Sequence, residues 1–331
     1  MEVTANQKRS RSWQQLWDDS VGPSNAREAV MLFLKGFGMG TADVIPGVSG
    51  GTIAFVSGIY DQFLAALSSV NARFFKNLFR LDIKEALSGV HFKFMIFLGL
   101  GMVTAILSTA RLMHYLIVHS PVYTWSAFMG LITASIYYVG KQIEDKSSFT
   151  TWFMMGLGTV VAYLVVSLIP VTTPNAAWFI SLCGLIGVCA MILPGLSGSF
   201  LLLILGKYEF ITGAVKNPLV WENMQIIMIF LTGTFTGLFT FSKLLKWFLS
   251  KYRSMAMALL TGFMIGAMKK VWPWKETLES KIVRGKTLVL REMNVMPQEL
   301  NSEVVFSMGL FLVGFALVIV LEKSAGQGQN S

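Results

Sequence analysis

Hydrophobic residues in this chain gather in long runs instead of alternating with polar residues. A helix that crosses a bilayer needs about 20 predominantly apolar residues, and runs of that length recur from Ala29 almost to the end of the chain. The pattern predicts an all-α polytopic membrane protein whose uninterrupted spans lie near 94–117, 123–140, 150–169, 224–247, 254–271 and 304–321.

Two further apolar segments, 28–68 and 176–215, are each interrupted by the motif P-G-x-S-G. Proline removes a backbone donor and closely spaced glycines weaken a helix. We therefore expect helix breaks at Pro46 and Pro194, with the helix restarting at the serine of each motif or at the glycine after it. Broken backbone at membrane depth must line a cavity or be packed inside protein.

The two interrupted segments belong to an internal repeat. At a constant offset of about 148 positions, identical residues recur in the same order: Gly36 and Gly184, Ala42 and Ala190, Pro46-Gly47 and Pro194-Gly195, Ser49-Gly50 and Ser197-Gly198, Gly58 and Gly206, Tyr60 and Tyr208. We predict a first membrane repeat over 28–169 and a second over 176–322, each a broken-helix hairpin followed by three transmembrane helices.

Charge indicates how the repeats are oriented. If each broken segment is a re-entrant hairpin that leaves on the side where it entered, each repeat crosses the membrane three times and the second is inverted. In that topology most Lys and Arg residues face the cytoplasm, as the positive-inside rule requires. The cytoplasmic segments that contain them are the tail 1–27, the loops 73–93 and 141–146, the segment 243–253 and the tail 323–331. Two full crossings per broken segment give the same parity.

Composition supports a membrane protein and excludes several other classes. The chain is 54% hydrophobic and 14% charged, whereas soluble domains are about 25% charged. Its net charge of +9 is spread between apolar runs, so we interpret it as a topology signal and expect no nucleic-acid partner.

Few residues offer cofactor chemistry. Cys183 and Cys189 lie in an apolar stretch, and His91, His114 and His119 have no metal-ligand spacing. We expect no metal, cofactor or disulfide. The first 27 residues lack a signal-peptide pattern; around Trp13 and Trp17 they form either one amphipathic turn at the membrane interface or a disordered tail.

The breaks are candidate anion sites. A helix that restarts near the midplane presents a serine cap and unpaired N–H groups at its positive end, which favours a phosphate. Alternatively, P-G-x-S-G is only a tight turn packed by small residues, but its duplication favours a binding site. The candidate phosphate-binding residues are Gly47, Ser49, Gly50, Gly51 and Thr52 in the first repeat, and Gly195, Ser197, Gly198 and Ser199 in the second.

Charged residues inside the apolar segments are the next candidates, because such charges are costly. Lys35 and Arg111 either contact the phosphate or extend to the interface from helix ends. Asp43, three residues before Pro46, either exchanges a proton during transport, as a coupling acid, or caps backbone donors at the break.

The G-x-S-G sequences at 47–50 and 195–198 also occur in intramembrane serine proteases, which need a base to activate the serine. Only His114 lies near a span, and the second copy has no histidine of its own. We therefore favour serine as a helix cap. The chain has no Walker motif for ATP hydrolysis, and we expect no enzymatic activity.

The polar segment 273–303 has no counterpart in the first repeat. Residues alternate around a central glycine in 281–291, which predicts a short β-hairpin in this extracytoplasmic loop. The loop either gathers anionic headgroups or forms a solvated cap.

The motifs G-x-x-D-x-x-P-G-V-S-G-G-T at 40–52 and C-A-M-I-L-P-G-L-S-G-S-F at 189–200 carry a resemblance to a known family. Over about 28–322 the chain resembles the bacterial PopT-type polyprenyl-phosphate (undecaprenyl-phosphate) transporters. The resemblance implies a flippase in the bacterial cytoplasmic membrane that returns the lipid-carrier phosphate to the inner leaflet for cell-envelope polymer synthesis, including peptidoglycan.

The implied partners are a polyprenyl-phosphate lipid, the surrounding membrane lipids and a coupling ion, either a proton or sodium. The alternative function is a small-anion transporter or channel that uses the same helix ends.

Overall fold

The computed structural model describes residues 12–44, 49–168, 173–283, 286–297 and 299–327. Within them, the first half of the chain forms helices α1 (Trp13–Asp19), α2 (Ala26–Val44), α3 (Gly50–Val56), α4 (Tyr60–Ser69), α5 (Ala72–Phe79), α6 (Ile83–Leu87), α7 (Phe92–His119), α8 (Pro121–Lys141) and α9 (Phe149–Ser167). The second half forms α10 (Ala177–Ile192), α11 (Gly198–Ile204), α12 (Tyr208–Lys216), α13 (Trp221–Lys251), α14 (Arg253–Val271), strands β1 (Lys275–Val283) and β2 (Lys286–Asn294), and α15 (Ser302–Gln327).

Within the described residues, five helices are long and apolar enough to cross a membrane: α7, α9, α13, α14 and α15. They confirm the prediction of a helical, polytopic membrane protein. The predicted span 123–140 also forms a helix, α8, but it is not among these five. Its hydroxyl groups lower its hydropathy, although Ser126 and Ser135 donate to carbonyl oxygens of their own helix and so leave no unpaired donor.

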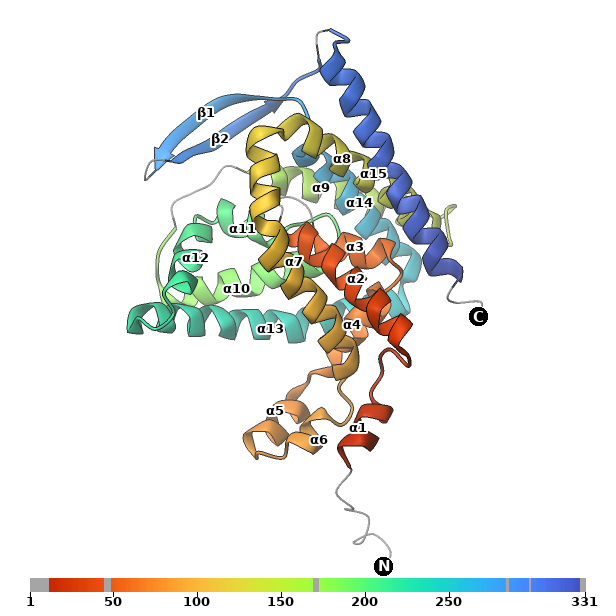
Figure 1. Ribbon diagram of the computed structural model, residues 1–331, viewed down its shortest axis with the longest axis vertical. Coiled ribbons are helices and arrows are strands. Elements are labelled where there is room, and N and C mark those ends of the chain that lie inside the picture. The colour runs from red at the N-terminus through yellow and green to blue at the C-terminus, as the bar shows by residue number, and fades with distance from the viewer. Residues whose placement is uncertain (1–11, 45–48, 169–172, 284–285, 298, 328–331) are drawn as a thin grey trace, which may run out of the picture.

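The helices pair in the same way in both halves of the chain. Helix α2 packs against α7, and α10, its counterpart in the repeat, packs against α13 (Figure 1). The last two helices of each half are exchanged: α8 packs against α15, and α14 packs against α9. Each half therefore completes the packing of the other.

Glycines at equivalent positions allow these close approaches. A Cβ at Gly36 of α2 would meet the carbonyl group of Leu98 in α7, and one at Gly184 of α10 would meet that of Phe230 in α13. The exchanged pairs repeat this pattern, because Gly130 faces Phe311 and Gly262 faces Met155. Small residues at such contacts let transmembrane helices pack backbone against backbone.

The broken segments contain more helices than the sequence pattern indicates. Gly58 and Gly206 have φ values of 70° and 64°, a left-handed conformation that glycine adopts without steric cost. They end α3 and α11, so that α4 and α12 follow as separate helices, and α11 and α12 differ in direction by 112°. We predicted one break per segment, and the second break was missed.

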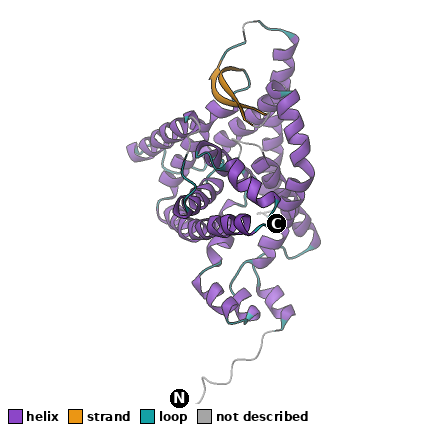
Figure 2. Ribbon diagram, turned by 90° about the vertical axis from the view of Figure 1, so that its left-hand side faces the viewer, coloured by secondary structure: helices purple, strands orange, loops and turns teal. Residues whose placement is uncertain are grey.

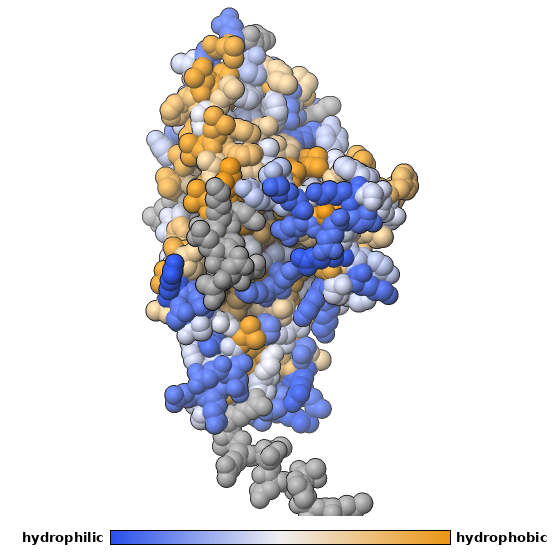
Figure 3. Space-filling view, turned by 90° about the vertical axis from the view of Figure 1, so that its right-hand side faces the viewer, coloured by the Kyte–Doolittle hydropathy of each residue, from blue (hydrophilic) through white to orange (hydrophobic). Residues whose placement is uncertain are grey.

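Polar elements lie at both ends of the molecule. Strands β1 and β2 form the predicted antiparallel hairpin, at the top in Figures 1 and 2. Helices α1, α5 and α6 lie at the bottom, where hydrophilic side chains gather on the face in Figure 3. Of the two alternatives considered for the segment around Trp13 and Trp17, the structure has a helical turn, α1, with Leu16 buried and both tryptophans exposed.

Contacts between loops show which connections share a side. Arg253, at the start of α14, lies 3.7 Å from the carboxylate of Asp61 and 3.9 Å from that of Glu144. Ser20 donates to the carbonyl oxygen of Val90, which joins the N-terminal segment to the end of the 73–93 loop. Near the hairpin, Lys275 lies over the ring of Trp125 in α8.

Candidate functional site

The helix breaks lie at the two sequence motifs. Helix α2 ends at Val44 and α3 begins at Gly50, while α10 ends at Ile192 and α11 begins at Gly198. Pro46 and Gly47 lie outside the described residues. In the second break, Gly195 has a φ of 88° and lies so close to Met264 of α14 that a Cβ would be 2.9 Å from its Cα.

The two breaks contact each other. The hydroxyl of Ser49 donates to the carbonyl oxygen of Leu193 at 3.0 Å. In the opposite direction, the N–H of Gly195 donates to the hydroxyl oxygen of Thr52 at 3.0 Å. Ser49 and Thr52 are each only 1% exposed. The broken backbone of one half therefore satisfies polar groups of the other, as buried polar groups require.

Tyr60 is a third connection, and its role was not predicted. Its hydroxyl donates to the carbonyl oxygen of Ile192, the last residue of α10, at 3.0 Å, and its side chain is 3% exposed. Tyr208 occupies the equivalent position and is 38% exposed. From the sequence, both tyrosines are typical interfacial residues, and only the second fits that interpretation.

A carboxylate occupies the start of α3. Gly50 donates its N–H to Asp43 Oδ1 at 2.7 Å, and Gly51 donates its N–H to Ser49 Oγ at 3.1 Å. The carboxyl group of Asp43 lies at the start of the helix, where the ionised form of an acid is stabilised by the helix dipole. Asp43 thus caps backbone donors at the break, which is one of the two roles considered from the sequence.

The start of α11 differs. Phe200 donates its N–H to Ser197 Oγ at 3.4 Å, and the hydroxyls of Ser197 and Ser199 lie 3.0 Å apart. At the repeat offset, the position equivalent to Asp43 is occupied by Met191. Ser197 is buried and Ser199 half-buried. The second break therefore has hydroxyl groups where the first has a carboxylate cap.

Close packing explains several of the candidate glycines. A Cβ at Gly50 would lie 2.6 Å from Asp43 Oδ2, and one at Gly51 would lie 2.7 Å from the carbonyl oxygen of Ile192. Gly198 approaches the carbonyl oxygen of Gly187 in the same way. Tight packing by small residues, the alternative considered from the sequence, is therefore present at both breaks.

Of the two basic candidates, Lys35 is described by the structure and does not lie at a break. Lys35 is half-buried and precedes Asp43 by eight residues, about 12 Å along α2 at 1.5 Å per residue. The side chain of Arg111 lies outside the described residues. Lys207 is buried, and its ammonium group donates to the carbonyl oxygen of Thr173 at 2.8 Å and to Asn175 Oδ1 at 2.6 Å. It ties the link before α10 to the bend after α11.

Among the side chains that the structure describes, no base is paired with either motif serine. Ser49 donates to a backbone carbonyl oxygen, and Ser197 pairs with another serine. The side chain of His114 is outside the described part of the chain. Among the described residues, no three His, Cys, Asp or Glu side chains are placed to hold a metal ion, and Cys183 and Cys189 are free thiols.

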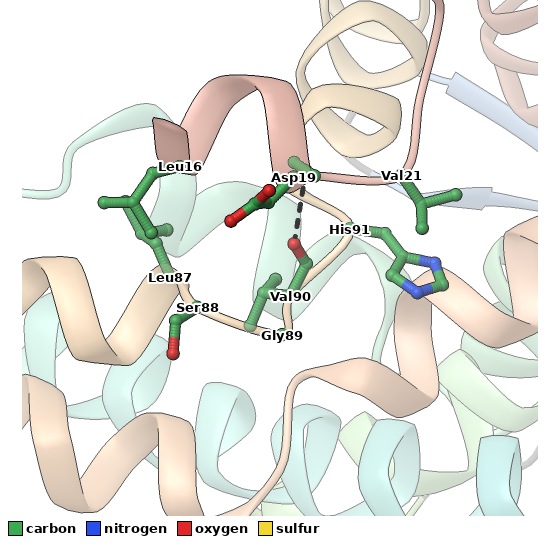
Figure 4. Close-up of a pocket in the computed structure, with 9 residues that line it drawn as sticks. Leu16, Asp19, Val21, Leu87, Ser88, Gly89, Val90 and His91 are labelled. Atoms are coloured by element: carbon green, nitrogen blue, oxygen red, sulfur yellow. Dashed lines mark hydrogen bonds between the residues drawn. The ribbon is translucent and has the colours of Figure 1, made fainter. Parts of the chain in front are cut away.

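A cavity of about 100 Å³ lies far from the breaks in sequence, between α1 and the start of α7. Figure 4 shows Leu16, Val90 and His91 around it. Its lining is mostly apolar side chains and backbone, and the hydrogen bond from Ser20 to Val90 closes one side.

Comparisons with known proteins agree on one family. A family model described as undecaprenyl phosphate translocase-like matches residues 39–289, which include both breaks. A polyprenyl-phosphate transporter of Vibrio cholerae serotype O1 is 39% identical over 301 residues, covering 88% of this chain and 96% of that protein. A polyprenyl-phosphate transporter of Staphylococcus aureus is 34% identical over 253 residues, covering 72% and 85%. No solved structure matches the chain.

Proposed function

Because the chain belongs to the undecaprenyl phosphate translocase-like family, we propose that it transports polyprenyl phosphate across the bacterial cytoplasmic membrane. The observation that carries this proposal is the direct contact between the two broken helices, through Ser49 with Leu193 and Thr52 with Gly195. A lipid phosphate needs polar groups for its headgroup at membrane depth, while its tail stays in hydrocarbon.

The proposed architecture is a pair of inverted repeats, 28–169 and 176–322, each with a re-entrant hairpin. The exchange of α8 and α14 supports this architecture, because equivalent helices of the two halves make equivalent contacts. In transporters built from inverted repeats, the substrate binds where the repeats meet. We place both termini in the cytoplasm, on the side where Arg253 meets Asp61 and Glu144. The hairpin of β1 and β2 then lies on the outer side.

The proposed headgroup site lies between the starts of α3 and α11. In this conformation Ser49, Thr52 and Ser197 are buried, so the headgroup reaches them only when the halves move apart. Of the two breaks, we propose that the phosphate reaches the second first, at Ser197 and Ser199, because that helix start lacks an equivalent of Asp43. Lys35 and Arg111 supply charge farther along the path.

Asp43 is the proposed coupling acid. A phosphate that approaches Gly50 meets a carboxylate already bound there, and two like charges 4 Å apart repel by about 4 kcal/mol at an effective dielectric constant of 20. Protonation of Asp43 removes this repulsion. Proton uptake and headgroup binding at α3 therefore favour each other, which is the linkage that coupled transport requires.

The direct test is headgroup accessibility of undecaprenyl phosphate in proteoliposomes. We expect transbilayer exchange that is selective over an unrelated phospholipid and is lost in the Ser49→Ala, Ser197→Ala double variant. The matched control is Ser135→Ala, Ser242→Ala: these serines are also buried, one in each half, but each donates only to a carbonyl oxygen of its own helix.

Two results would contradict the proposal. Exchange no faster than in protein-free liposomes, with or without a proton or sodium gradient, would refute lipid transport. Anion-dependent current in the same vesicles would then favour the small-anion alternative. Equal losses in both double variants would instead show that the motif serines have no special role in transport.

A further inference from the structure

A cluster of charged residues lies beside the second break, at the base of the hairpin. The ammonium groups of Lys270 and Lys275 lie 3.5 Å and 3.6 Å from the same oxygen, Oε2, of Glu292. The side chains are 25%, 11% and 30% exposed, respectively. Two cations share one carboxylate, so the cluster carries a net charge of +1 in a partly desolvated place, where electrostatic interactions are stronger than in water.

The cluster is joined to α11 and α8 through aromatic rings. Lys270 lies over the ring of Phe200, 4.9 Å from its centroid, and Phe200 is the residue whose N–H is capped by Ser197. Lys275 lies over the ring of Trp125 at 4.6 Å. Aromatic faces stabilise a partly desolvated cation, and here Phe200 holds the ammonium group of Lys270 next to the first turn of α11, while Trp125 holds that of Lys275 against α8.

The cluster breaks the symmetry of the repeat. Lys275 and Glu292 belong to the hairpin, which has no counterpart in the first half, where residues 142–148 join α8 to α9. When Gly130 of α8 is aligned with Gly262 of α14, the position equivalent to Lys270 is Tyr138. A feature present on only one side of a duplicated transporter is suited to a task that occurs on only one side.

Part of the geometry is structural. Lys275 donates to the carbonyl oxygen of Lys270 at 2.7 Å, and Asn294 donates to that of Lys269 at 2.9 Å, so both satisfy the C-terminal end of α14. Those two hydrogen bonds would suffice for a helix cap. They do not account for a second lysine on the same carboxylate oxygen, nor for its position over Phe200.

We propose that Lys270 and Lys275 form a receiving site for a phosphate monoester on the hairpin side, in which Glu292 holds the two ammonium groups together until the phosphate replaces it. This inference rests on the proposed function and assigns the first contact of the headgroup before it reaches Ser197. A phosphate dianion has three acceptor oxygens and therefore suits two ammonium groups better than one carboxylate oxygen does.

The site should weaken in alkaline solution. Burial lowers the pKa of Lys275 to about 8, a shift that Glu292 opposes and Lys270 reinforces. Among the described side chains, these are the charged groups that face Lys275 from β2 and α14, and α8 contributes the uncharged Trp125. As pH rises through about 8, Lys275 loses its charge and phosphate affinity should fall, while Lys275→Gln should lack this step.

The test measures binding of dodecyl phosphate and of inorganic phosphate to the purified full-length protein, by titration calorimetry at constant ionic strength. We expect Lys270→Gln and Lys275→Gln to weaken dodecyl phosphate binding about tenfold or more, the range for one charge-assisted hydrogen bond. Glu292→Gln should strengthen it severalfold, because a competing charge is removed.

The matched control is Lys269→Gln. Lys269 lies in the same last turn of α14 but donates to the hydroxyl of Ser167 and lies over the ring of Tyr163. The Lys269→Gln variant should bind dodecyl phosphate with an affinity within about twofold of that of the unaltered protein. A melting curve for each variant identifies a change that comes from loss of fold alone.

The direction of the Glu292→Gln effect separates the two interpretations. If the cluster is purely structural, Glu292→Gln should weaken binding just as the loss of either lysine does. That result would overturn the inference, and so would unchanged binding in both lysine variants. Equal affinity for inorganic and dodecyl phosphate would assign the site to the free anion and overturn its role for lipid.

The inference and the proposed function can fail separately. If the unaltered protein moves undecaprenyl phosphate in vesicles but the lysine variants bind dodecyl phosphate normally, only the receiving site is refuted. If the lysine and glutamate variants respond as expected but no lipid moves, the proposed transport is refuted and the phosphate site stands.

Discussion

Thr52→Val tests the contact between the two broken helices. The substitution nearly preserves side-chain shape but removes the hydroxyl oxygen that accepts the N–H of Gly195 at 3.0 Å. Gly195 lies in the non-helical break between α10 and α11 and is buried, as is Thr52. Its N–H would then be left without this acceptor in a place that water does not reach.

The expected cost follows from that burial. A buried donor without a partner costs about 1–3 kcal/mol, more than the average of about 0.6 kcal/mol for side-chain hydrogen bonds between transmembrane helices. The range of about 1–3 kcal/mol applies here because Gly195 lies in a break, where no carbonyl oxygen of a preceding helical turn can accept its N–H. The equilibrium between folded and unfolded protein should shift by roughly 5- to 150-fold, since 1.4 kcal/mol is a factor of ten.

The assay is unfolding of the purified protein by sodium dodecyl sulfate in mixed micelles, followed by circular dichroism. The matched control is Thr261→Val: Thr261 is also buried, but its hydroxyl donates only to the carbonyl oxygen of Met257 in its own helix. Removing it leaves no donor unpaired, and we expect a loss below about 1 kcal/mol. Equal losses in the two variants, or no loss in Thr52→Val, would refute the reasoning.

Two further substitutions probe the packing and the coupling. Gly233→Ala should lower the free energy of unfolding by about 1–3 kcal/mol in the same assay, because the new Cβ would clash with the carbonyl group of Ser181. A Cβ at Gly309 has open space around it, so Gly309→Ala should change the free energy of unfolding by less than about 0.5 kcal/mol. Similar values for the two variants would contradict this reasoning. Asp43→Asn keeps an acceptor for Gly50 but not the charge, so we expect exchange without a gradient to persist and proton-driven accumulation of lipid in vesicles to be lost; accumulation at the unaltered level would exclude Asp43 as the coupling acid.

The local architecture at each break could be predicted from sequence. Proline followed by a serine cap has a direct structural meaning, and helices α3 and α11 begin at Gly50 and Gly198, directly after the motif serines. The hairpin also follows from its alternating pattern. These features depend on residues close together in the chain, where backbone preferences and capping decide the outcome.

The contacts between the halves were beyond the sequence pattern. Repeat alignment shows which residues are equivalent, but not that Thr52 meets Gly195 or that Tyr60 reaches Ile192. Tyr60 and Tyr208 occupy equivalent positions in the repeat, and only the hydrogen bond from Tyr60 to Ile192 at the end of α10 separates their roles. Lys207 is a charged residue in an apolar segment, and only the structure shows that it is buried, with its ammonium group bound to Thr173 and Asn175.

The most direct measurement is a cryo-electron microscopy structure of the protein in nanodiscs that contain undecaprenyl phosphate. Our account predicts phosphate density between the starts of α3 and α11, within about 3 Å of backbone N–H or hydroxyl groups of 49–52 or 197–199, with the contact between Ser49 and Leu193 opened. A headgroup bound only outside both breaks, with that contact intact, would contradict it.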